Sequence, residues 1–109
     1  LQVIAFLREK RISLFLEGVA ALSDLEAGTV ANLTDAGEGQ GLAVLARAIG
    51  ADRSQFATMA LLLERGRTGK PVPSARLQAI CRLFDSITAH DAVATVADWR
   101  AKVVARTAA

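Results

Sequence analysis

His90 and Cys81 are the only histidine and the only cysteine of the chain, and they are the first candidates for catalytic chemistry. A phosphotransfer histidine would need a lysine and a glycine following it at helical spacing, and the residues after His90 supply neither. A general base would also need a substrate pocket and an orienting partner. Cys81 shares an apolar stripe with Ile80 and Phe84, which is typical of a small buried hydrophobe rather than an activated thiolate. We therefore expect no catalytic site, and His90 should lie on the surface in the first turn of a helix.

The segment 37–41 is rich in glycine and precedes a predicted helix, where backbone N–H groups can bind phosphate. Its spacing is GxGxG between two predicted helices, whereas the dinucleotide fingerprint requires GxGxxG after a strand. We expect a tight turn in which Gly41 allows two helices to approach closely. No cofactor and no metal site are expected.

Two groups of basic residues are candidates for binding an anion or an acidic partner. The first group surrounds a loop, and the second lies near the first turn of the chain; they are Arg65, Arg67, Lys70 and Arg76, and Arg8, Lys10 and Arg11. Charges at loops and helix ends are usually solvated, and Arg65 also complements the end of its own helix. The candidate anion contacts are Arg65, Arg67 and Lys70.

Trp99 is the only tryptophan, and it is the best pointer to an interface. The buried face of its helix is expected to consist of four valines, Val93, Val96, Val103 and Val104. Trp99 lies near the edge of that face, where it either packs inside or faces a partner. Tryptophan and arginine are enriched where protein interfaces are tightest, so Trp99 with Arg100 forms the candidate interface.

The composition favours helices and argues against nucleic acid as a partner. The hydrophobic share of 52% comes largely from Ala and Leu, and only 5% of the residues are aromatic. A net charge of +2 is too small to drive binding through counterion release. A helix-turn-helix reader is also disfavoured, because its candidate recognition helix opens with Glu38 and Gln40 rather than Arg, Lys or Asn.

Length and cysteine content suggest one helical domain in a reducing compartment. The 109 residues suffice for one packed core, and a single cysteine cannot form an intramolecular disulfide. The longest apolar stretches, such as 59–63, are far shorter than the roughly 20 residues that span a bilayer. The chain starts with Leu1 and lacks the pattern of a signal peptide. We expect residues 1–109 to be a single domain, a C-terminal fragment of a longer protein.

Apolar residues at spacings of three and four predict seven helices. They cover residues 1–8, 12–22, 25–33, a segment after Asp35 that closes at Gly50, 53–65, a segment after Ser74 that carries Leu77 through Ile87, and a segment after Thr88. Gly66 is expected to stop the fifth helix, and the segment 66–73, with both prolines, is the clear loop and a candidate hinge. The fifth helix should be central, because Leu61 and Leu62 widen its apolar stripe.

Side-chain caps are expected at the starts of the later helices. The predicted pairs are Ser23 with Glu26, Asp35 with Glu38, Asp52 with Gln55, and Thr88 with Asp91, and Ser74 is expected to cap the sixth helix. The predicted core residues are Phe15, Leu45, Phe56, Leu63 and Phe84. No strand pattern occurs, so the predicted fold is all-α, either a compact bundle or stacked helical hairpins of six to seven short helices.

Three segments together resemble a known domain. They are Leu7-Arg8, the run from Leu14 through Ser23 with Val30 and Leu33 after it, and the run from Gly41 through Ala48. This pattern is similar to a domain of unknown function found in alphaproteobacterial proteins and numbered twenty-three thirty-six. The resemblance implies a helical fold and a cytoplasmic bacterial origin, and it carries over no functional residue.

These observations favour a non-enzymatic protein–protein interaction or assembly module in the cytoplasm. Its partner would be a protein. One candidate partner is a second copy of the chain, which would give a homodimer. The alternative is a regulatory domain that binds a small molecule or an anion in a pocket between helices. A deep pocket with converging polar groups would favour the alternative, whereas an exposed apolar patch around Trp99 would favour the first reading.

Overall fold

The computed structural model describes residues 3–35 and 39–108, with side chains except at positions 35, 67 and 103–108. Within these residues the chain forms seven helices and no strand. The helices are α1 (Val3–Arg8), α2 (Ile12–Ser23), α3 (Ala27–Asp35), α4 (Gln40–Ala48), α5 (Arg53–Thr68), α6 (Ser74–Ser86) and α7 (Ala89–Ala108). The all-α prediction is therefore confirmed. No helix in these parts of the chain combines the length and the apolar character that crossing a bilayer requires.

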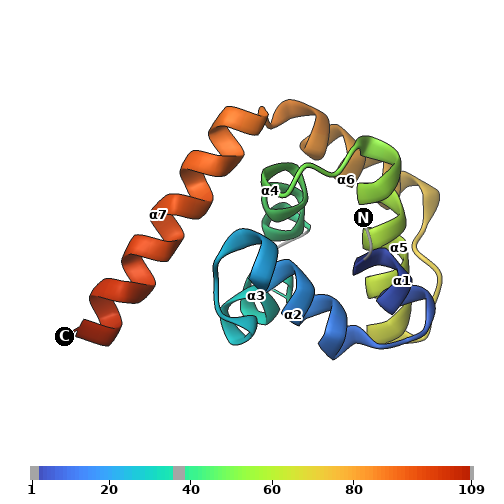
Figure 1. Ribbon diagram of the computed structural model, residues 1–109. Coiled ribbons are helices and arrows are strands. Elements are labelled where there is room, and N and C mark those ends of the chain that lie inside the picture. The colour runs from blue at the N-terminus through green and yellow to red at the C-terminus, as the bar shows by residue number, and fades with distance from the viewer. Residues whose placement is uncertain (1–2, 36–38, 109) are drawn as a thin grey trace.

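The helices are arranged around α4, which contacts α2, α3, α5, α6 and α7 (Figure 1). The sequence explains this position, since all five residues from Leu42 to Ala46 are buried, and a helix that is apolar on every side has to be enclosed. The fifth helix was predicted to be central, and this prediction is wrong. Leu61 and Leu62 on α5 are only partly buried, and α5 packs mainly on α1 and α6.

The core is one contiguous cluster of buried apolar residues. The five predicted core residues Phe15, Leu45, Phe56, Leu63 and Phe84 are all buried within it. The rings of Phe56 and Phe84 stack with centroids 4.7 Å apart, which joins α5 to α6 at the centre of the cluster.

Glycines set two of the closest helix approaches. A Cβ atom at Gly41 would overlap the backbone carbonyl of Leu33, so the expected close approach at Gly41 is confirmed for α3 and α4. Gly66 does not stop α5 as predicted, because the helix continues to Thr68 and ends with Gly69 in a left-handed conformation. Tertiary packing explains why glycine occupies position 66, because a Cβ there would lie 2.8 Å from Cδ1 of Ile12.

Two of the predicted capping pairs are present. The Asp52 side chain accepts from the backbone N–H of Gln55 at 2.8 Å, and the Gln55 side chain accepts from the N–H of Asp52 at 2.9 Å. These reciprocal bonds form the capping box of α5. The hydroxyl of Thr88 likewise accepts from the N–H of Asp91 at 3.0 Å at the start of α7.

Two other predicted caps are wrong. Ser23 lies in the last turn of α2, and its hydroxyl donates to the carbonyl of Val19 at 2.6 Å instead of capping α3. Ser74 is itself the first residue of α6, whose start has no side-chain cap. The pair of Asp35 and Glu38 cannot be compared, because Glu38 and the Asp35 side chain lie outside the described residues.

The inward face of α7 differs from the predicted one. Val93 is 55% exposed, whereas Ala92 and Val96 are buried. Trp99 follows these two at helical spacing and is partly buried against the core. The side chains of Val103 and Val104 lie outside the described part of the structure. The buried face of α7 is rotated by about one residue from the predicted face, because α7 packs on α4. The spacing of apolar residues within α7 does not by itself reveal this packing.

Candidate functional site

Trp99 lines an open groove between α3, α4, α6 and α7, which we call the Trp99 groove. Its volume is about 610 Å³. The lining residues are Leu33, Gln40, Gly41, Val44, Leu83, Ser86, Ile87, Asp91, Thr95 and Trp99. Half of these are apolar side chains, and Asp91 is the one charged side chain among them. The groove is therefore a mainly apolar surface with polar groups around it.

Trp99 lies at the border between the core and the surface. Its side chain packs against the core, and part of it remains exposed in the groove. Tryptophan in such a half-buried position presents a large, rigid apolar surface that a partner can cover.

Arg100, the second candidate interface residue, binds within the chain. Its Nε donates to the carbonyl of Asp24 at 3.0 Å, and its Nη2 donates to the carbonyl of Ser23 at 2.7 Å. Helix α2 has no basic residue in its last turn, so Arg100 supplies the positive charge that its C-terminal carbonyls favour. Arg100 thus positions α7 against α2, about 76 residues away in sequence.

Arg47 on α4 acts in the same way at the end of α6. Its guanidinium group donates to the carbonyls of Ile87 at 2.8 Å and Phe84 at 3.2 Å. Helix α6 also lacks a basic residue in its last turn, so an arginine of α4 completes its C-terminus. The sequence analysis did not single out Arg47, because its partners lie 37 and 40 residues away.

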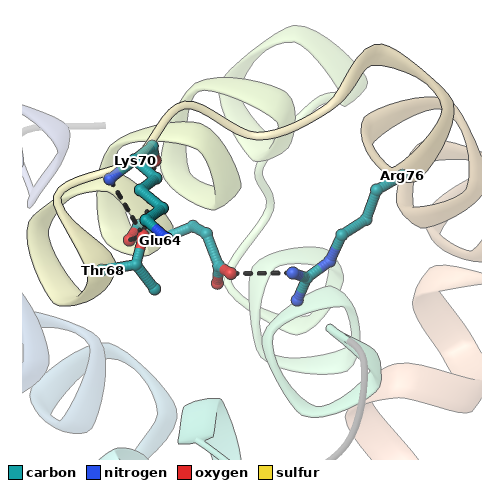
Figure 2. A network of polar contacts seen from close by, with 4 residues as sticks. All are labelled: Glu64, Thr68, Lys70 and Arg76. Carbon is teal, nitrogen blue, oxygen red and sulfur yellow. Dashed lines mark hydrogen bonds and ion pairs between the residues drawn. The ribbon is translucent and has the colours of Figure 1, made fainter.

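The basic residues around the loop after α5 do not form one cluster (Figure 2). Arg76 Nη1 lies 2.8 Å from Glu64 Oε1, while the Lys70 N–H donates to the Thr68 hydroxyl at 3.2 Å. The side chain of Arg67 lies outside the described residues. Arg65 lines a separate groove together with Arg8 and Lys10.

The candidates for catalysis gain no support from their surroundings. His90 is exposed near the start of α7, and Cys81 is a buried free thiol on α6. In the parts of the chain that the structure describes, no three His, Cys, Asp or Glu side chains gather where they could hold a metal ion. Residues 37 and 38 of the glycine-rich segment lie outside those parts, and Gly39 adopts a left-handed conformation just before α4.

Within the described residues, seven helices form a small all-α domain that carries the mainly apolar Trp99 groove. A comparison with family models identifies the class further. The model described as "Uncharacterised protein conserved in bacteria (DUF2336)" matches residues 2–97, and the chain belongs to this family. The family resemblance drawn from the core and turn residues is thereby confirmed. Searches of the curated proteins and of the solved structures found no match.

Proposed function

We propose that this domain is a non-enzymatic protein–protein interaction or assembly module that binds its partner in the Trp99 groove. The observation that carries this proposal is the half-buried Trp99 on an apolar groove lined by residues of α3, α4, α6 and α7. Interfaces combine apolar residues at their centre with polar residues at their edge. In the Trp99 groove the apolar residues include Leu83, Ile87 and Trp99, and the polar residues include Gln40 and Ser86.

The chemistry of the groove favours apolar side chains on a partner helix. Such recognition places a row of apolar residues from one helix into a groove between others. The chain itself exposes two large apolar side chains on different helices, Leu22 on α2 at 56% and Val93 on α7 at 55%. A second copy of the chain is therefore the partner that we infer, and the cytoplasm, where a free thiol such as Cys81 persists, is the compartment that we propose.

The test is the solution mass of the domain by light scattering over a concentration series, with Trp99 fluorescence recorded alongside. We expect a dimer at high concentration, and a red shift of Trp99 emission when the dimer dissociates on dilution. A strict monomer with unchanged Trp99 emission at every concentration would contradict self-assembly through this groove.

A pair of matched variants locates the interface. Ser86 is exposed and lines the groove, whereas Ser13 is exposed on α2 and does not line it. We expect Ser86→Arg to abolish the dimer, because a long charged side chain would occupy the groove, and Ser13→Arg to leave it intact. Equal effects of the two substitutions would place the interface elsewhere.

A further inference from the structure

A second groove lies where the turn between α1 and α2 meets the C-terminal half of α5, and we call it the basic groove. Its volume is about 650 Å³. The lining residues are Leu7, Arg8, Lys10, Ile12, Leu62, Arg65, Gly66 and Gly69. The charged residues among them are all cationic, and they come from segments that lie about 55 residues apart in sequence.

The acidic residues beside these cations in sequence are paired with other arginines. Glu9 lies 3.5 Å from Arg11, and Glu64 lies 2.8 Å from Arg76 (Figure 2). Among the described residues, no ion pair joins Arg8, Lys10 or Arg65 to a carboxylate. Their three positive charges therefore remain available to an anion.

The apolar residues of the basic groove lie deeper than the cations. Leu7 is buried and Ile12 and Leu62 are partly buried, whereas the three cationic residues are exposed. Gly66 helps to form this surface, because any side chain there would press on Ile12. The groove thus has an apolar floor and positive charge at its mouth.

The position of Lys10 is fixed by the turn that carries it. Lys10 has a left-handed backbone with φ of 61°, and its N–H donates to the carbonyl of Leu7 at 3.1 Å. The next N–H, of Arg11, donates to the carbonyl of Phe6 at 2.7 Å. Two hydrogen bonds hold the backbone of this turn, so binding of a ligand has to order only the side chain of Lys10.

We propose that the basic groove binds a soluble, small amphiphilic anion, in which a phosphate or carboxylate group is joined to a short apolar chain. The anionic group would lie against Arg8, Lys10 and Arg65. Hydrogen bonds from these cationic side chains to an anion are charge-assisted and therefore stronger than neutral ones. The apolar chain would cover Leu7, Ile12 and Leu62. A volume of about 650 Å³ falls within the range of roughly 300–1,000 Å³ usual for small-ligand sites. This site is separate from the Trp99 groove and does not depend on self-assembly.

The probe for this site is octyl phosphate, kept below the concentration at which it forms micelles. We expect saturable binding by calorimetry, with shifts of the backbone amide resonances of residues 7–12 and 62–69. Inorganic phosphate lacks the chain and octyl glucoside lacks the charge, so each should bind at least about tenfold more weakly. Absence of saturable binding, or equal binding of inorganic phosphate, would overturn the proposal.

Three variants assign the binding to the cations. Arg65→Gln and Lys10→Asn each remove one charge, and asparagine tolerates the left-handed backbone at position 10. Arg82 on α6 is equally exposed but lines neither groove, so Arg82→Gln is the matched control. The double variant that combines Arg65→Gln with Lys10→Asn should bind octyl phosphate about tenfold or more weakly, and the control should not change the affinity. Equal affinity in the double variant and the control would overturn the assignment.

A final experiment distinguishes binding of a soluble ligand from binding to a membrane surface. The domain is sedimented with vesicles of phosphatidylcholine containing phosphatidylglycerol, at moderate ionic strength. We expect the domain to remain in the supernatant while monomeric octyl phosphate still binds it. Binding to the anionic vesicles without binding of octyl phosphate would overturn the proposal of a small soluble ligand.

Discussion

The guanidinium carbon of Arg47 lies 4.1 Å from the ring centroid of Phe84. The same guanidinium group donates to two carbonyls at the end of α6, and the Phe84 ring stacks on Phe56 with an interplanar angle of 6°. One side chain of the central helix α4 thus provides a cation–π contact and a helix cap at once. Through this contact α4, α5 and α6 are joined.

Arg47→Ala should therefore lower the free energy of unfolding by about 2–3 kcal/mol. The expected loss combines hydrogen bonds from a charged group with the cation–π contact. Arg82→Ala, on the exposed face of α6, is the control and should change stability by less than about 0.5 kcal/mol. Urea titration of both variants measures the difference. A loss in Arg47→Ala no larger than in the control would mean that α6 does not depend on Arg47.

Arg100→Ala should cost about 1–2 kcal/mol of unfolding free energy, because the carbonyls of Ser23 and Asp24 lose their charged donor. The ion pair of Arg100 with the Asp24 carboxylate has little part in this, since the Asp24 side chain is 87% exposed. Asp24→Asn should consequently leave the melting temperature nearly unchanged, and Arg100→Ala should lower it. Equal destabilisation by the two substitutions would show that the ion pair, and not the carbonyl contacts, holds α7 on α2.

Gly41→Ala and Gly28→Ala should change stability in opposite directions. A Cβ at Gly41 would meet the backbone of Leu33, and this overlap should cost about 1–3 kcal/mol. Gly28 lies on α3 with nothing within 4 Å of the added Cβ, so alanine should stabilise the helix by up to about 1 kcal/mol. Thermal unfolding followed by circular dichroism distinguishes the two. Tolerance of alanine at position 41 would contradict the close approach of α3 and α4.

Phe56→Ala should cost roughly 3–5 kcal/mol of unfolding free energy, the usual range for truncating a buried phenylalanine. Phe56 is fully buried and stacks on Phe84, so the loss includes both buried area and the ring contact. Denaturant titration provides the measurement. A loss below about 1 kcal/mol would show that α5 does not pack into the core through this residue.

The sequence by itself determined the features that depend on near neighbours in the chain. Spacings of three and four located the helices, because a helix must turn one apolar face inward. The capping box of Asp52 and Gln55 was predictable, because both of its hydrogen bonds close within three residues. The burial of Phe56 and Phe84 followed from size and periodicity, since large apolar side chains on such a face have few alternatives to the core.

The tertiary structure decided which distant segments meet, and with it the surfaces that could bind. The sequence predicts a helix stop at Gly66 because glycine is common just beyond helix ends, yet the structure needs glycine there for the close approach to Ile12, 54 positions earlier. Arg8 and Lys10 meet Arg65 at one groove, and Arg100 reaches the end of α2. The spacing of residues within one helix cannot predict these long-range contacts, because the packing angle of two helices depends on side chains along both of them. Both grooves are lined by residues that lie far apart in sequence, so they exist only in the folded chain.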